Sequence, residues 1–130
     1  MQLLTDTVSN PNGIALTNDE KHLLVANSFA KEAYLYDFEI DADGTLKNGR
    51  IVHDFTDRIK NNGDIPDGLK IDKKGNIFIS GPQGLWILNA AYKAIAHLEL
   101  PHAISNCWLS EDNKTLFITG SDKILRLKLK

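Results

Sequence analysis

"IPDGLKIDKKGNIFISG", residues 65–81, is the stretch of this 130-residue chain that decides the fold. Two short runs rich in Ile, Leu and Phe, at 69–72 and 76–80, are separated by Lys-Lys-Gly, and Pro-Asp-Gly stands directly before the first run. Short apolar runs bounded by Gly and Pro are typical of β-strands joined by tight turns. The stretch therefore predicts a β-hairpin with a carboxylate, Asp67, at its entrance.

The same pattern occurs twice more in the chain. Residues 10–28 read NPNGIALTNDEKHLLVANS, and residues 104–121 read ISNCWLSEDNKTLFITGS. Aligning the three stretches places Asn12, Asp67 and Asn106 at one position, and the inner strands are then expected at 14–17, 69–72 and 107–110. Repeats of about 40 residues with four strands each are typical of propeller blades.

Further apolar runs supply the other strands of each repeat. Second strands are expected at 22–26, 76–80 and 115–119, third strands at 32–40, 84–89 and 123–129, and fourth strands at 50–55 and 93–100. We predict an all-β, propeller-type single domain with an outer strand at 2–8, a blade at 11–58, a blade at 66–100 and an incomplete blade at 104–130. About three four-stranded blades, half of a six-bladed propeller, cannot close a ring, because propellers have about four to eight.

Composition excludes several kinds of partner. Seventeen acidic and fifteen basic residues give a net charge of −2 without a basic stripe, so we expect no nucleic-acid partner. The chain has neither a signal-peptide pattern nor an apolar run long enough for a bilayer, so we expect a soluble protein with no membrane partner and cytoplasmic by default. Cys107 is the only cysteine, which excludes an intrachain disulfide and a cysteine-based metal cluster.

Asn12 and Asp67 are the candidate metal ligands. Inner strands line the channel of a propeller, so oxygen side chains at their entrances would converge on a hard cation such as Ca²⁺ or Mg²⁺. Pro-Asn-Gly and Pro-Asp-Gly are also common turn sequences whose polar side chains cap their own backbone. The residues alone leave both interpretations open. Asn106, and His102 in the loop before it, are further candidates to line the channel.

Four segments resemble a known family. Residues 9–28, 36–46, 64–89 and 113–129 are similar, in the same order, to the C-terminal half of the SMP-30/gluconolactonase/regucalcin-like family. The resemblance implies a six-bladed propeller with one divalent metal, which hydrolyses sugar lactones and related esters. It assigns Asn12 and Asp67 to the metal and Asp67 also to the role of general base. Ca²⁺ is the favoured ion, with Zn²⁺, Mg²⁺ and Mn²⁺ as alternatives.

The chain departs from the family pattern at its first half. The first metal ligand of the family, a glutamate, and its N-terminal substrate-binding Arg and Asn residues have no counterpart here. Ca²⁺ takes about six to eight oxygens, so two side chains make a weak site. We therefore expect a missing N-terminal half, in the same or a second chain, or a homodimer that completes a six-bladed ring. A non-catalytic binding or structural module and a related esterase or phosphotriesterase remain alternatives to the lactone hydrolase.

Overall fold

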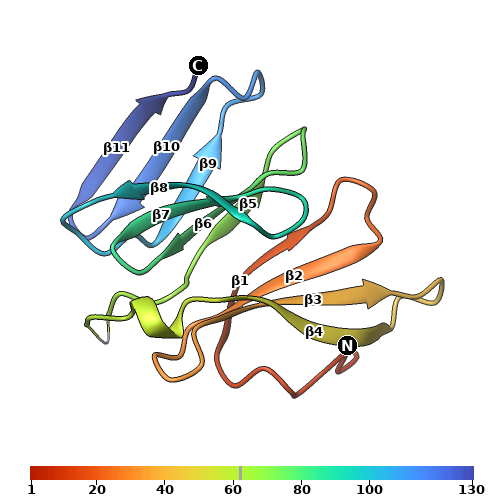
Figure 1. The fold of residues 1–130 in the computed structure, drawn as a ribbon. Helices are drawn as coiled ribbons and strands as arrows, with labels where there is room; N and C mark the ends of the chain where they lie inside the picture. The colour runs from red at the N-terminus through yellow and green to blue at the C-terminus, as the bar shows by residue number, and fades with distance from the viewer. Residues whose placement is uncertain (62) are drawn as a thin grey trace.

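Eleven antiparallel strands form three sheets in the computed structural model, which describes residues 1–61 and 63–130 (Figure 1). The first sheet holds β1 (Pro11–Leu16), β2 (His22–Asn27), β3 (Tyr34–Ile40) and β4 (Leu46–Asp54). The second sheet holds β5 (Leu69–Ile71), β6 (Ile77–Gly81), β7 (Gly84–Leu88) and β8 (Ala94–Glu99). The third sheet holds β9 (Asn106–Leu109), β10 (Thr115–Gly120) and β11 (Lys123–Lys128). The predicted all-β, propeller-type fold is confirmed.

Each sheet is a meander in which strands adjacent in sequence are also adjacent in space. The turns that join the first two strands of each sheet place one residue in the left-handed region, Glu20, Gly75 and Asn113, with φ of 57°, 84° and 55°. This conformation reverses the chain within a few residues, and Gly and Asn adopt it at low cost. The polar turns of the three repeats therefore produce three equivalent hairpins.

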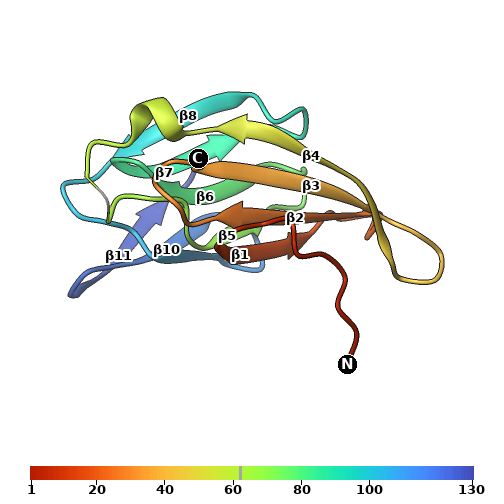
Figure 2. The same ribbon diagram turned by 90° about the horizontal axis from the view of Figure 1, so that it is seen from below.

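The sheets stack face to face around their inner strands. Strand β5 contacts both β1 and β9, which lie on either side of it (Figures 1 and 2). Between the first two sheets, the core includes Leu24, Leu35, Leu69, Ile79 and Leu88. Between the second and third sheets, it includes Phe78, Leu85, Cys107, Leu116 and Ile118. The second sheet is therefore covered on both faces, as a blade inside a propeller is.

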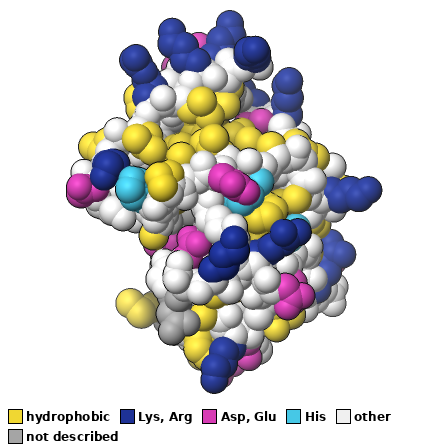
Figure 3. All heavy atoms as spheres, turned by 60° about the vertical axis from the view of Figure 1, so that its left-hand side comes forward, with side chains coloured by type: hydrophobic (Ala, Val, Ile, Leu, Met, Phe, Trp, Pro, Cys, Tyr) yellow, Lys and Arg dark blue, Asp and Glu magenta, His cyan; other side chains and the backbone are white. Residues whose placement is uncertain are grey.

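The outer sheets are covered by another sheet on one face only. In β10, Leu116 and Ile118 are buried against the second sheet, whereas Phe117 between them is exposed. The space-filling view, which brings the side of the third sheet forward, shows hydrophobic side chains at the surface below lysine and arginine side chains (Figure 3). The three sheets thus form an open partial propeller.

Residues 2–8 do not form the expected outer strand. They have no regular secondary structure, and they pair with no strand of the described residues. Val8 alone is buried, against Val25 and Phe38 of the first sheet, and the chain before it projects away from the sheets (Figure 2). A strand needs a neighbour for its backbone hydrogen bonds, and residues 1–61 and 63–130 offer none to this segment.

The helical content is small. The turn η1 (Thr56–Arg58), a single 3-10 turn, leads from the first sheet toward the second. Among residues 1–61 and 63–130, no helix is long and apolar enough to cross a membrane.

Candidate functional site

The entrances of the first two inner strands bring Asn12 and Asp67 together. Gly13 is buried, and a Cβ added to it would overlap the backbone carbonyl oxygen of Asp67. Only glycine allows β1 to approach the segment before β5 this closely. The approach sets Asn12 beside Asp67, close enough for the Asn12 side chain to lower the pKa of the Asp67 carboxyl. The two predicted metal ligands are therefore neighbours, from different sheets.

The environment of Asp67 favours proton exchange or cation binding. Burial raises the pKa of the half-buried Asp67 carboxyl above its ordinary value, and the hydrogen bond from Asn12 acts in the opposite direction. A carboxyl that loses water without gaining an equally strong cationic partner holds its proton more tightly. Perturbed carboxyls of this kind are common at functional sites, although structural sites also contain them.

The backbone around Asp67 is fixed by its own sheet and by the first sheet. The N–H of Asp67 donates to the carbonyl of Ser80 at 3.4 Å, and the N–H of Ser80 donates to the carbonyl of Gly68 at 3.0 Å. The hydroxyl of Ser28, in the first sheet, donates to the carbonyl of Pro66. Asp67 is thus presented by a buried proline and glycine on a tied segment, which limits the positions that its carboxylate can take.

In the third sheet the position of Asp67 is occupied by Ser105. The N–H of Ser105 donates to the carbonyl of Thr119 at 2.8 Å, as the N–H of Asp67 donates to Ser80. Ser80 and Thr119 are the penultimate residues of β6 and β10, so the two bonds are equivalent. The sequence alignment put Asn106 at this position and was wrong by one residue.

Asn106 lies against Gly68, the residue after Asp67, whereas His102 lies apart from the pair. The amide oxygen of Asn106 accepts a hydrogen bond from the N–H of Cys107 at 2.9 Å and from Nζ of Lys70 at 3.2 Å. His102 lines a hollow beside Gln83 that Asn12 and Asp67 do not line. The structure therefore places Asn12 beside Asp67 and Asn106 beside the following Gly68, and His102 apart from these three.

Cys107 is a packing residue. It pairs with Ile118 and is 4% exposed, in the core between the second and third sheets. Burial raises the pKa of its thiol to about 11. Its Sγ lies 3.7 Å from the carbonyl oxygen of Phe78. A thiol held in this state is a poor nucleophile, because the reactive form is the thiolate.

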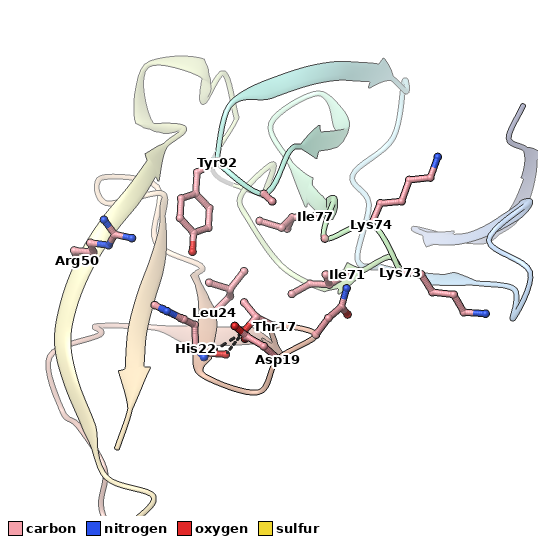
Figure 4. A pocket seen from close by; sticks show the side chains of 13 residues that line it. Thr17, Asp19, His22, Leu24, Arg50, Ile71, Lys73, Lys74, Ile77 and Tyr92 are labelled. Carbon is pink, nitrogen blue, oxygen red and sulfur yellow. Dashed lines mark hydrogen bonds between the residues drawn. The ribbon is translucent and has the colours of Figure 1, made fainter. Parts of the chain in front are cut away.

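A cleft of about 490 Å³ lies between the first and second sheets at the other end of their inner strands (Figure 4). Its lining includes Thr17, which follows β1, whereas Asn12 lies at the start of that strand. The labelled side chains of His22, Arg50 and Tyr92 approach it from β2, β4 and the turn after β7 (Figure 4). The cleft is therefore separate from the Asn12 and Asp67 site.

A buried carboxylate joins the two sheets beside this cleft. Asp37 is 1% exposed and accepts hydrogen bonds from Nδ1 of His22 at 2.7 Å, the Tyr92 hydroxyl at 2.7 Å and the Arg50 guanidinium at 3.0 Å. Burial would raise the pKa of Asp37, but the bonds from Tyr92, His22 and Arg50 together hold it below its ordinary value. Sequence reasoning missed this network, although Asp37 occupies the same strand face as the buried Leu35.

The described part of the chain does not gather His, Cys, Asp and Glu side chains into a metal centre. Across residues 1–61 and 63–130, no three His, Cys, Asp or Glu side chains gather where they could hold a metal ion. Asn12 and Asp67 therefore represent one side of such a site at most.

Comparison with known proteins finds relatives that are described in similar terms. A family model described as the SMP-30/Gluconolactonase/LRE-like region matches residues 1–122. A gluconolactonase from Zymomonas mobilis is 31% identical over 134 residues, which cover 100% of this chain and 38% of that protein. An uncharacterised protein from Sulfolobus acidocaldarius is 29% identical over 126 residues, which cover 93% of this chain and 44% of that protein.

Solved structures give the same result. A gluconolactonase from Xanthomonas campestris is 26% identical with a TM-score of 0.85, over 99% of this chain and 40% of that chain. A calcium-binding regucalcin from Agrobacterium tumefaciens is 21% identical with a TM-score of 0.74, over 92% of this chain and 41% of that chain, and shows the shared fold. The chain thus spans well under half the length of these relatives.

Proposed function

The chain belongs to the SMP-30/gluconolactonase/LRE-like family, and on this basis we propose that it is the part of a metal-dependent sugar-lactone hydrolase that contributes Asn12 and Asp67. The observation that carries the proposal is the approach of these two side chains at the entrances of β1 and β5. The relatives are more than twice as long as this chain, so the full activity belongs to a completed ring.

The chemistry of the two side chains suits a divalent cation. A carboxylate and an amide oxygen are hard donors of the kind that Ca²⁺ and Mg²⁺ prefer. Asn12 lies close enough to Asp67 to lower the pKa of its carboxyl, so both side chains are placed where one cation could reach them. The raised pKa of Asp67 is what a carboxylate shows when burial is not balanced by a cation. Ca²⁺ is the first ion to test, since a structural relative is described as calcium-binding, and Zn²⁺, Mg²⁺ and Mn²⁺ are alternatives.

Asp67 would act as the proton carrier of lactone hydrolysis. A bound divalent ion supplies polarisation of the lactone carbonyl. The Asp67 carboxylate takes a proton from the attacking water as the water oxygen bonds to the carbonyl carbon. When the ring C–O bond breaks, the same carboxyl returns the proton to the departing oxygen, and the product is a hydroxy acid. The bonds that tie Pro66 and Asp67 to Ser28 and Ser80 hold the carboxylate in place, with Asn12 beside it.

Metal binding is the first test, because it separates a hydrolase from a non-catalytic module. Calorimetric titration of the chain with Ca²⁺, Mg²⁺, Mn²⁺ and Zn²⁺ should give binding heat with at least one ion. Asp67→Ala should abolish this heat, and Asn12→Ala should weaken it. Asp57→Ala is the matched control, because Asp57 is an exposed carboxylate in η1, and it should bind as the wild type does. No heat from folded protein with any of the four ions would favour a binding or structural module.

Substrate class is the second test. Acid release from sugar lactones, aryl esters and phosphotriesters, corrected for spontaneous hydrolysis, distinguishes a lactonase from a related esterase or phosphotriesterase. We expect metal-dependent lactone opening that is lost in Asp67→Ala. Preferred turnover of the aryl esters or phosphotriesters would reassign the substrate while leaving the metal site intact.

A further inference from the structure

The first and third sheets each present an apolar face that no sheet of the described chain covers. On the third sheet this face holds Trp108, Phe117 and Ile124, which are 63%, 42% and 80% exposed. On the first sheet it holds Ile14 and Leu16, which are 59% and 46% exposed, beside Val25, which Val8 and Phe38 bury. Figure 3 shows hydrophobic side chains gathered at the surface on the side of the third sheet. Large exposed apolar patches mark interaction surfaces.

The two faces are the complementary halves of one repeated interface. Ile14 pairs with Val25 as Leu69 pairs with Ile79, and Leu69 and Ile79 pack on the preceding sheet. The exposed face of the first sheet is therefore equivalent to the face of the second sheet that packs on the first. Conversely, Trp108 and Phe117 form the pair that corresponds to Ala15 and Leu24, which pack on the following sheet. The exposed face of the third sheet is thus equivalent to the face of the first sheet that packs on the second.

We propose that a second copy of this chain covers both faces, with the third sheet of each copy packed on the first sheet of the other about a two-fold axis. Two copies give six sheets, which lies within the range of about four to eight blades found in closed propellers. Two-fold dimers are also the commonest oligomers. The proposal stands on packing and does not depend on lactone hydrolysis.

Charge complementarity supports a second copy as the occupant. Arg126 pairs with Phe117 in the third sheet as Asp37 pairs with Leu24 in the first. Inside the chain, Asp37 faces the next sheet and binds Tyr92, which lies in the turn 89–93 that joins β7 to β8. In the dimer, Arg126 occupies the position of Asp37 and faces the turn of the partner that corresponds to 89–93.

That partner turn is acidic. It is the turn 41–45 between β3 and β4. In this turn the N–H of Asp41 donates to the carbonyl of Thr45, and the N–H of Gly44 donates to the carbonyl of Asp41. The same two bonds close turn 89–93, from Asn89 to Lys93 and from Tyr92 to Asn89. The glycine of this turn replaces Tyr92 and leaves room for a long side chain, while Asp41 and Asp43 flank it. Asp41 pairs with Lys47 of its own copy, so Asp43, which has no cation paired with it in the described structure, is the carboxylate that Arg126 of the other copy meets, and this favours the pairing.

The N-terminal segment also fits this arrangement. In the first and second sheets a fourth strand lies beyond β3 and β7, whereas β11 has no neighbour on that side in the described structure. Residues 2–8 are an unpaired segment that leads directly into β1. With the first sheet of the partner seated on the third sheet, residues 2–8 of the partner lie at the free edge of β11 and complete it. Asn12 and Asp67 of both copies then line one channel, so each copy completes the site of the other.

Measurement of mass tests the proposal. By light scattering after size-exclusion chromatography, the wild-type chain should have twice its monomer mass of 14.5 kDa. Phe117→Asp and Ile14→Asp should each give folded monomers. In the two-fold dimer every interface contains Phe117 of one copy and Ile14 of the other, so either substitution disrupts both interfaces. Ile95→Asp is the matched control, since Ile95 is 57% exposed on β8, and it should remain dimeric. Circular dichroism confirms that each variant is folded.

Mixing the two monomeric variants gives the sharper test. The Phe117→Asp chain keeps its first-sheet face and the Ile14→Asp chain keeps its third-sheet face, so one intact interface forms between them and a dimer should reappear. A folded wild-type monomer would overturn the proposal, and so would a mixture that stays monomeric. A mass that keeps rising with protein concentration would show an open head-to-tail assembly instead of a closed ring, and would overturn the proposal. If a preceding segment of a longer chain is the natural cover, the 130-residue chain stays monomeric, which also overturns the proposal.

Discussion

Gly13 and Asp67 lie in direct backbone contact across two sheets, so closely that a Cβ on Gly13 would overlap the Asp67 carbonyl oxygen. Gly68 repeats the relationship one sheet later, where a Cβ would lie 2.7 Å from the carbonyl oxygen of Ser105. The glycines of Pro-Asn-Gly and Pro-Asp-Gly therefore have a steric role in bringing the inner strands together. This role is additional to the conformational freedom that a turn requires.

Gly13→Ala should separate the inner strands and destabilise the fold. The new methyl group has no room against backbone, and forced overpacking costs about 1–3 kcal/mol. Urea denaturation at neutral pH measures the loss. Gly63→Ala is the matched control, because a Cβ on Gly63 meets nothing within 4 Å. Equal stability of the two variants would show that β1 can move away from Asp67 without cost.

Asp37→Asn should destabilise the chain and flatten its response to acid. The substitution weakens the bonds to His22, Arg50 and Tyr92, and disrupting such a buried partner costs about 1–3 kcal/mol. The folded pKa of Asp37 lies below the ordinary 3.8. Its stabilising effect is therefore present above pH 3.8 and is lost as the pH falls through the folded pKa.

Thermal unfolding from pH 7 down to pH 3 checks this expectation. The wild type should lose more stability over the range than Asp37→Asn does. Asp122→Asn is the control, because the pKa of Asp122 is also lowered, by a hydrogen bond from Lys123, but its side chain is exposed. A variant at Asp122 that behaves like Asp37→Asn would contradict a special role for the buried network.

The sequence predicted the fold because the repeated pattern depends on interactions between residues that are close in sequence. Short apolar strands and polar turns recur in all three units, and the convergence of Asn12 and Asp67 follows from aligned strand entrances. The register of the third unit is less well determined by sequence. Ser105 and Asn106 are both polar, and the apolar position of Ile14 and Leu69 is filled by Cys107, so an alignment on asparagine shifts the unit by one residue.

Other features depend on partners that the sequence does not display. Residues 2–8 have the composition of a strand, but strand formation requires a neighbour, and the described chain offers none. Asp37 lies within an apolar strand, and its three partners come from β2, β4 and the turn after β7. A charged residue on a buried strand face signals such a network, yet its partners can be identified only from the packing of the two sheets.

Cys107 should resist alkylation in the folded protein. Its pKa of about 11 and its burial between two sheets keep the thiol protonated and covered at pH 8. Ellman's reagent should count no fast-reacting thiol in the native wild type and one after denaturation. Ser105→Cys adds an exposed thiol next to the buried one and should give one fast-reacting group. Fast reaction of the native wild type would show that the second and third sheets separate readily.

Asp67→Asn should leave the metal-free protein as stable as the wild type at pH 7, or make it more stable. Burial raises the folded pKa of Asp67, so the contribution of this group to stability is full below the ordinary pKa of 3.8 and is lost as the pH rises through the folded pKa. At neutral pH the half-buried carboxylate is therefore a cost to the fold, and an uncharged amide of the same shape removes it.

Excess metal should reverse this order. An ion that binds the folded state alone raises stability by mass action, so Ca²⁺ should increase the melting temperature of the wild type and leave Asp67→Asn unchanged. Thermal melts in chelator and in Ca²⁺ give the four values needed, and Asp57→Asn should follow the wild type in both. If Asp67→Asn is instead the less stable protein in chelator, the carboxylate stabilises its own turn. The turn interpretation of Pro-Asp-Gly would then account for Asp67 without a metal.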